Sequence, residues 1–193
     1  MRRWAADTDT VVYDFVDHVP SATVSLVTPD GPQACPWGPA GNHGGGLGRG
    51  PLEPAERFVC DPQRPWLWVA PTVTVDLDLL PRRCVWQHPA GKDPVRSTFT
   101  RVPLGEKLVL DAGLYYSSER KRELAPVTVR VLIDGKPSGE LVHHDGDGWA
   151  RTEIDTSQRK GHVATVSIET VTDRPFQRTL CWAATTRNGS PSK

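Results

Sequence analysis

Residues 125–156 constrain the fold most, because they contain the clearest alternation of apolar and polar side chains in the chain. Every second position in the first part of this stretch is a branched apolar residue: Val127, Val129, Val131 and Ile133. This period of two is typical of a β-strand with one buried face. An Asp-Gly pair follows at residues 134–135, and such pairs favour a tight hairpin turn. An extended pattern resumes over residues 140–144, so the sequence predicts an antiparallel hairpin.

A second turn, over residues 145–148, leads into a further predicted strand over residues 149–155. Side chains along a strand alternate between its two faces. By this parity Trp149 is expected on the outer face together with Arg151 and Glu153, and the residues between them turn inward.

The first part of the chain has a different character. Residues 8–19 are predicted to form a helix, because four apolar residues recur at i, i+3, i+4 and i+7: Val12, Phe15, Val16 and Val19. A short strand is expected over residues 22–28. Residues 31–54 are rich in Gly and Pro and are expected to form a long surface loop. The glycines lack the Lys-Ser/Thr pair of a phosphate-binding loop.

From Arg57 onward, about nine short predicted strands are separated by turn signals, which is the pattern of an antiparallel β-sandwich or jelly roll. The sequence therefore predicts a mainly β fold with a short N-terminal helix-strand extension. The expected division is an N-terminal segment with its loop over residues 1–56, a sandwich over residues 57–187, and a tail over residues 188–193.

Charge and hydropathy exclude several classes of partner. The chain of 193 residues has 23 Lys plus Arg and 23 Asp plus Glu, so no net field attracts nucleic acid or an anionic membrane. No apolar run approaches the roughly 20 residues of a membrane span. The first residues lack the apolar core of a signal peptide.

The four cysteines, at positions 35, 60, 84 and 181, have no metal-ligand spacing. An even count in a loop-rich β chain fits two disulfides and an oxidising, extracytoplasmic compartment. Of the three pairings, we favour Cys84 with Cys181, in the first and last strands of the main sheet region. Cys35 with Cys60 would then close the Gly/Pro-rich loop between them. Four reduced, buried thiols are the alternative.

The layout of residues 82–187 resembles the galactose-binding-like jelly rolls, the fold of many carbohydrate-binding modules. The resemblance is carried by VTVRVLIDG, GWARTEIDT, GHVATVSIET and LCWAATTR. It implies a β-sandwich that binds sugars through loops at one end. Many members of this fold hold a structural calcium, which leaves calcium open here although no cofactor is predicted.

Tryptophans are the first candidate ligand-binding residues, because an exposed indole stacks on the apolar face of a sugar ring. The candidates are Trp66, Trp68 and Trp149, whereas Trp86 and Trp182 are expected in the core.

Residues 143–147, with the sequence HHDGD, form the densest group of polar functions, and His144 and Asp147 are the further candidate ligand-binding residues. A plain hairpin turn, a calcium or ligand loop, and a catalytic site are the three interpretations. The stretch lacks the distal Glu of an EF-hand. The chain has no G-x-S-x-G, HExxH or GxGxxG motif, so no catalytic residue and no metal ligand is predicted.

The sequence predicts a non-catalytic, extracytoplasmic β-sandwich that binds carbohydrate or serves as an accessory domain of a larger envelope or surface protein. A structural or protein-interaction domain without a sugar ligand is the alternative. A hydrolase that uses residues 143–147 is the second alternative. The sequence does not indicate an oligomeric state.

Overall fold

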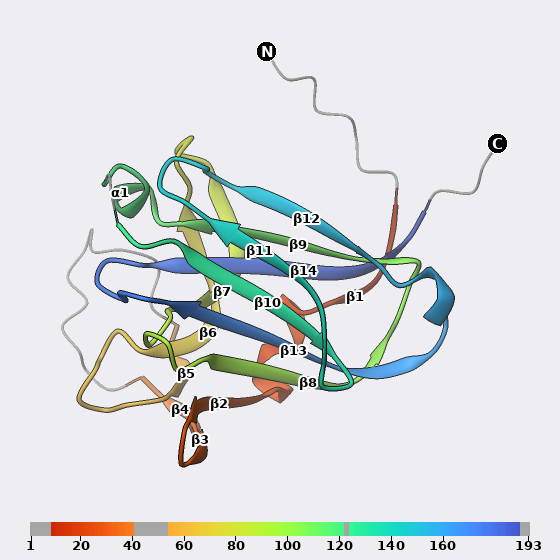
Figure 1. The fold of residues 1–193 in the computed structure, drawn as a ribbon, viewed down its shortest axis with the longest axis horizontal. Coiled ribbons are helices and arrows are strands. Elements are labelled where there is room, and N and C mark those ends of the chain that lie inside the picture. The colour runs from red at the N-terminus through yellow and green to blue at the C-terminus, as the bar shows by residue number, and fades with distance from the viewer. Residues whose placement is uncertain (1–8, 41–53, 122–123, 190–193) are drawn as a thin grey trace.

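The computed structural model describes residues 9–40, 54–121 and 124–189, and the described chain forms two packed antiparallel sheets (Figure 1). The first sheet has eight strands. In spatial order they are β12 (Ala150–Asp155), β9 (Lys107–Leu114), β14 (Leu180–Asn188), β7 (Pro81–Gln87), β6 (Trp68–Val75), β5 (Glu56–Val59) and β4 (Trp37–Pro39), with β1 (Thr10–Asp14) also paired to β14.

The second sheet has six strands. In order they are β11 (Lys136–His143), β10 (Val127–Ile133), β13 (Val163–Thr172), β8 (Val95–Pro103), β2 (Thr23–Thr28) and β3 (Gly31–Ala34). Helical structure in the described residues is limited to three short pieces: η1 (Val16–Ser21), α1 (Tyr116–Glu119) and η2 (Ser157–Arg159). The predicted mainly β, antiparallel sandwich is confirmed.

The predicted hairpin over residues 127–143 is confirmed as β10 and β11. Asp134 and Gly135 form its turn with φ angles of 51° and 75°, the left-handed conformations that a two-residue hairpin loop requires. Val129 and Val131 of this hairpin are fully buried. Val166 and Ile168 of β13, which were also predicted to face the core, are fully buried as well. The alternation of apolar and polar residues therefore identifies correctly which face of each strand is turned toward the core.

The predicted helix over residues 8–19 is wrong. Residues 10–14 form strand β1, which pairs with β14, and a 3-10 helix, η1, begins at Val16. Phe15, Val16 and Val19 are buried, but Val12 lies at the surface. The predicted strand over residues 22–28 is confirmed as β2.

Strands from both predicted parts, residues 1–56 and 57–187, contribute to each sheet. The predicted loop over residues 31–54 contains β3 and β4, and its residues 41–53 lie outside the described part of the chain. In the predicted tail, Asn188 ends β14, and residues 190–193 lie outside the described residues.

A single buried amide connects the two sheets at the centre of the core. Gln87, at the end of β7, donates to the carbonyls of Val95 (2.8 Å) and Ile168 (3.1 Å) in the second sheet. Its Oε1 accepts hydrogen bonds from Ser97 Oγ (2.6 Å) and Trp182 Nε1 (3.1 Å). All the hydrogen-bonding capacity of this side chain is therefore used within the core.

Both predicted disulfides are confirmed: Cys84 is bonded to Cys181, and Cys35 to Cys60. The first joins β7 to β14 within one sheet, and the second closes the segment that leads from β3 to β6. Trp182 and Trp86 are buried as expected. Among the described residues, no helix has the length and apolar character to cross a membrane.

Candidate functional site

Several loops gather at the end of the sandwich shown at the left of Figure 1. We call this region the loop end, and it comprises residues 60–67, 88–94, 115–121, 144–149 and 173–179. Four of the five predicted ligand-binding residues lie within it: Trp66, His144, Asp147 and Trp149, the last of them next to the start of β12.

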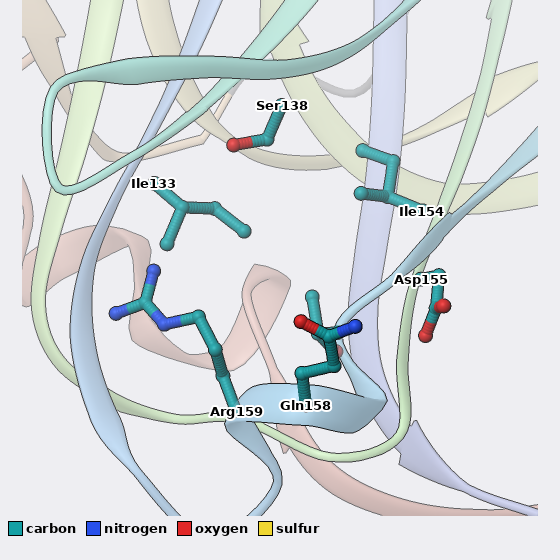
Figure 2. A pocket seen from close by; sticks show the side chains of 7 residues that line it. Ile133, Ser138, Ile154, Asp155, Gln158 and Arg159 are labelled. Atoms are coloured by element: carbon teal, nitrogen blue, oxygen red, sulfur yellow. The ribbon is translucent and has the colours of Figure 1, made fainter.

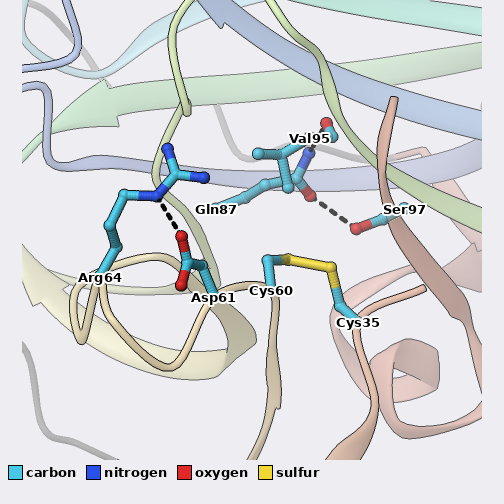
Figure 3. The surroundings of a disulfide bond; sticks show 7 residues. All are labelled: Cys35, Cys60, Asp61, Arg64, Gln87, Val95 and Ser97. Carbon is cyan, nitrogen blue, oxygen red and sulfur yellow. Dashed lines mark hydrogen bonds and ion pairs between the residues drawn. A yellow bond between two sulfur atoms is a disulfide. The ribbon is translucent and has the colours of Figure 1, made fainter. Parts of the chain in front are cut away.

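The loop over residues 60–67 is fixed by one disulfide and by the side chain of Asp61 (Figure 3). Asp61 accepts hydrogen bonds from the backbone N–H of Gln63 (2.8 Å) and from Arg64 Nε (2.7 Å). The bond from Arg64, followed by the bond from Gln63, lowers the pKa of Asp61 below its usual value. Cys60 is held to Cys35 at the start of the loop. The sequence CDPQRPWL thus folds into a braced turn.

Trp66 is the aromatic side chain that this turn presents, and it is 37% exposed. Its ring centroid lies 4.5 Å from that of His88, and the Arg64 guanidinium lies over it at 5.8 Å. The carbonyl of Trp66 accepts a hydrogen bond from Trp86 Nε1 (3.4 Å). The indole is therefore supported from the protein side and open to solvent over part of its surface.

His88 supports Trp66 as a neutral imidazole. Burial lowers its pKa to about 4, the hydrogen bond to the Pro89 carbonyl opposes this, and the positive charge of Arg178 lowers it further. Its Nδ1 lies 2.9 Å from that carbonyl and donates to it. An uncharged ring at this position allows close packing against Trp66 and Trp86.

Trp68 is buried, 4% exposed, and stacks on Trp86 with ring centroids 4.9 Å apart. The two rings pack with the Cys84–Cys181 disulfide on the outer side of the eight-stranded sheet. In this structure Trp68 supports the surface beside Trp66 rather than presenting a ring to solvent.

Trp149 is half-buried and packs against the same cluster from the side of β12. A Cβ on Gly113 would come within 2.7 Å of Trp149 Cε3, so only glycine leaves room for the indole there. The Arg82 guanidinium lies over the ring at 5.7 Å. The parity argument placed Trp149 on the outer face, and the structure agrees with that placement, although part of the ring is covered.

The turn over residues 143–148 is held from within by a buried pair. His143 Nε2 lies 3.0 Å from Glu119 Oε1 and donates to the Gly148 carbonyl at 2.8 Å. Both side chains of the pair are fully buried. Burial acts to lower the pKa of His143, but the hydrogen bond and the charge of Glu119 outweigh it, so the pKa is raised.

Glu119 also accepts hydrogen bonds from two backbone N–H groups, those of Leu114 (3.0 Å) and Gly146 (2.9 Å). Asp145 is bonded to the buried Arg178 through Nη1 at 2.6 Å. These contacts make the stretch a hairpin turn whose charged groups serve to fix its shape.

The remaining polar residues of this turn face solvent. His144 has a 64% exposed side chain, and Asp147 Oδ2 accepts a hydrogen bond from the His144 N–H at 2.7 Å. No group of three or more metal-ligating side chains occurs in the described part of the chain. Asp145 is engaged with Arg178 and His143 is fully buried, so the geometry fits a turn better than a calcium loop or a catalytic site.

Sequence reasoning missed the residues that position the candidates, namely Arg64, His88, Glu119 and Arg178. Only one of them had a local signal: Asp61 and Arg64 stand three residues apart around a proline, a spacing that suits a side-chain-braced turn. The other three act through partners distant in sequence.

No family model and no curated protein matches the chain. Solved structures with a similar strand arrangement include a structure of the CBM51-2 and INT domains from Clostridium perfringens ZmpB in complex with GlcNAc. It is 13% identical, covers 62% of this chain and 25% of that chain, and has a TM-score of 0.44.

Another is the CBM51 module from a Clostridium perfringens GH95 protein in complex with methyl-galactose, 9% identical over 61% of this chain and 81% of that chain, with a TM-score of 0.42. A third contains the M60 catalytic domain with both CBM51 domains of ZmpB. It is 12% identical over 95% of this chain and 20% of that chain, with a TM-score of 0.47.

The chain spans only 25% to 37% of the length of the first three similar structures. At these identities the likeness concerns the fold alone. Each of the three structures described here contains a CBM51 module.

Proposed function

We propose that this chain is a non-catalytic module that binds carbohydrate at the loop end, with Trp66 as the principal contact. The observation that supports this proposal is a partly exposed indole on a loop braced by a disulfide and by Asp61. A ring held in place loses little conformational freedom on binding, which favours affinity.

The groups around Trp66 suit a polyhydroxylated partner. The indole offers an apolar face to the C–H groups of a sugar ring. Arg64, whose guanidinium lies over part of the ring system, and its partner Asp61 provide hydrogen-bond donors and acceptors for hydroxyl groups. Because the two charges are paired, the site has no excess charge that would select an ionic ligand.

The other predicted residues contact the ligand less, or only indirectly, in this proposal. Trp149 is a second, less exposed aromatic contact, and His144 with Asp147 forms a polar rim on the neighbouring turn. Trp68 acts from below, through the stack with Trp86 that supports the surface.

The proposed setting is extracytoplasmic, because two disulfides form and persist in oxidising compartments. We further propose that the module is an accessory part of a larger envelope or surface protein. In that role it would hold its parent protein against a glycan.

A glycan array combined with affinity electrophoresis on soluble polysaccharides tests the proposal. Methyl-galactoside and N-acetylglucosamine are included as probes, since these sugars accompany two of the similar modules. Trp66→Ala is expected to weaken binding about tenfold or more, equivalent to about 1.4 kcal/mol. Trp149→Ala is expected to weaken it less.

The control is Val163→Ala, which shortens an exposed apolar side chain, 60% exposed, at the start of β13 and outside the loop end. This variant is expected to bind like the wild type. Thermal unfolding of each variant separates lost contact from lost folding, and Trp66→Phe, which retains a ring against His88, is expected to bind with intermediate affinity. Wild-type affinity in Trp66→Ala, or no glycan bound by the unaltered chain, would contradict the proposal.

The protein-interaction alternative draws on a different observation. The tip of the β6–β7 hairpin exposes Leu79 (60%) and Leu80 (40%), and Asp76 fixes the tip by accepting hydrogen bonds from Leu80 N–H and Arg82 Nε. A chain that binds no glycan but self-associates or captures a partner, and loses this behaviour in Leu79→Ser, would favour that alternative.

A further inference from the structure

A hollow lies at the end of the sandwich opposite to Trp66. It has a volume of about 380 Å³ and opens between the turn of the β10–β11 hairpin and the segment from β12 to η2 (Figure 2). This size is within the range of about 300–1,000 Å³ that is typical of small-molecule sites. Its lining residues are Ile133, Ser138, Ile154, Asp155, Thr156, Gln158 and Arg159.

The apolar part of the hollow comes from one strand of each sheet. Ile133 and Ile154 are almost entirely buried and project toward the hollow from β10 and β12 (Figure 2). A Cβ on Gly139 would come within 2.6 Å of the Ile154 side chain, so the glycine allows the edges of the two sheets to approach closely. The result is a rigid, apolar surface between the two sheets at this end of the sandwich.

An irregularity in β11 brings a hydroxyl group to this surface. Val131 pairs with Gly139 and Leu132 pairs with Pro137, which leaves Ser138 as an extra residue without a pairing partner on β10. Bulges of this kind change the direction of one side chain and are frequent beside binding sites. The Ser138 hydroxyl donates to the Lys136 carbonyl at 3.0 Å and retains its acceptor lone pairs.

The charged groups around the hollow are held by contacts outside it. Arg159 is bonded through Nη2 to Asp134, whose other oxygen accepts the Thr165 N–H at 2.9 Å. Asp155 accepts hydrogen bonds from Ser157, and these bonds lower its pKa, so it stays ionised. The positions of one guanidinium and one carboxylate are thereby fixed before any ligand arrives.

Gln158 differs from these residues because its amide makes no hydrogen bond with any described residue. It extends from η2 on the same side as Arg159, facing the side of the hollow formed by Ser138 (Figure 2). A free amide offers two donors and one acceptor. It is therefore the group most available to a ligand.

We propose that this hollow is a second binding site for a neutral polyhydroxylated ring, such as one sugar unit. The two isoleucines would contact the C–H face of the ring, and Gln158, Asp155 and Arg159 would bond its hydroxyl groups. The lone guanidinium is already paired with Asp134, so an anion gains little there. No metal-ligating group of three side chains is present in the described residues. The site does not depend on Trp66.

Two-dimensional ¹H–¹⁵N NMR tests the proposal with methyl glycosides of glucose, galactose and mannose as probes, each added up to about 50 mM, because a single ring is expected to bind with a millimolar Kd. At least one glycoside is expected to shift the amide signals of residues 133–139 and 154–159 in a saturable manner. Gln158→Ala is expected to weaken this binding at least about fivefold. Its exposed side chain has no hydrogen bond to any residue that the structure describes, so the fold is expected to be unchanged.

The matched control is Gln33→Ala, which removes the same amide from an exposed position on β3 and is expected to leave the shifts unchanged. In Trp66→Ala, the shifts around the hollow should persist, which separates this site from the loop end. The proposal is overturned if no probe shifts these signals, or if Gln158→Ala binds as tightly as the wild type. Shifts confined to the loop end would support the first site and overturn the second.

Discussion

We expect the side chain of Gln87 to contribute more to the free energy of unfolding than most single polar residues do. Its amide makes four hydrogen bonds to groups from both sheets. We expect Gln87→Leu to lower the free energy of unfolding by about 3 kcal/mol or more, because the Ser97 hydroxyl, the Trp182 N–H and two carbonyls would be left unsatisfied in the core. Urea unfolding measures this change.

Gln33→Leu is the matched comparison, since Gln33 lies at the surface of β3. This substitution is expected to change stability by less than about 0.5 kcal/mol. Equal effects at the two positions would show that Gln87 has no special role in joining the sheets.

The lowered pKa of His88 predicts that the folded protein loses stability in acid. Its pKa is lowered from 6.5 to about 4, so the folded state favours the neutral ring. The contribution is complete above pH 6.5 and is lost as the pH falls toward 4, where the unfolded chain takes up the proton first. At about 1.4 kcal/mol per pKa unit, the loss amounts to about 3 kcal/mol.

Replacing His88 with Gln removes the titrating group. Denaturant unfolding between pH 4 and 7 is therefore expected to show a steep decline in the wild type and a shallower one in His88→Gln. Parallel curves for the two proteins would mean that His88 has the same pKa in the folded and unfolded states.

At the candidate site, sequence reasoning identified the residues that face outward but not those that hold them. The outer position of Trp149 followed from strand parity alone. The contact of Trp66 with His88 could not be foreseen, because 22 positions and two strands separate them in the chain. Trp68 was predicted as a candidate ligand-binding residue together with Trp66, but it begins β6 and stacks on Trp86.

At the scale of elements, α1 and the turn over residues 143–148 form one unit through Glu119. We expect Glu119→Gln to loosen both segments while the sheets stay intact, because the carboxylate accepts hydrogen bonds from Leu114, Gly146 and His143. Hydrogen exchange of amides in residues 116–119 and 144–148 is expected to accelerate about tenfold or more.

The same substitution is expected to reverse the direction in which the pKa of His143 is shifted. In the wild type the raised pKa of His143 contributes stability at pH below about 6.5, and this is lost as the pH rises through the raised value. Without the negative charge of Glu119, burial dominates and the pKa is expected to fall below 6.5, as an NMR titration would show. Glu140→Gln, an exposed carboxylate on β11, serves as the control and should alter neither property.

Elements with a strict period of two were predictable, and the N-terminal segment was not. Residues 127–133 have an apolar residue at every second position, with Leu132 as the one apolar residue out of step, and form β10 as expected. Residues 8–19 match a helical period, but the part of β14 beyond its pairing with β7 provides hydrogen-bond partners for residues 10–14, and Val11 and Val12 can stay exposed there. Tertiary pairing outweighs local propensity in such a short segment.

At the scale of the whole molecule, the two disulfides are expected to contribute unequally. Cys84 and Cys181 are separated by 97 positions, whereas Cys35 and Cys60 are separated by 25. Loop-closure entropy gives about 4.7 kcal/mol for a loop of about 100 residues and about 3 kcal/mol for about 15 residues. Thermal unfolding should therefore show a larger drop in Tm for Cys84→Ala with Cys181→Ala than for Cys35→Ala with Cys60→Ala.

Binding measured on the same variants separates their roles. Removing the Cys35–Cys60 bond frees the loop that presents Trp66, so glycan affinity is expected to fall in this variant and to stay near the wild-type value in the variant that lacks Cys84–Cys181. If affinity is lost only in the variant that lacks Cys84–Cys181, the braced loop is not the source of binding.

The pairing of β1 with β14 has a mechanical consequence. Thr10 stands opposite Asn188, and the two strands run antiparallel from that point. Tension that pulls these two residues apart would break the hydrogen bonds between the strands one after another, starting at this end. It would not load all of them at once, as a shearing force along the strands would. The first strand would therefore peel away under weak force, whereas the cystine between β7 and β14 would keep those two strands joined under the same load.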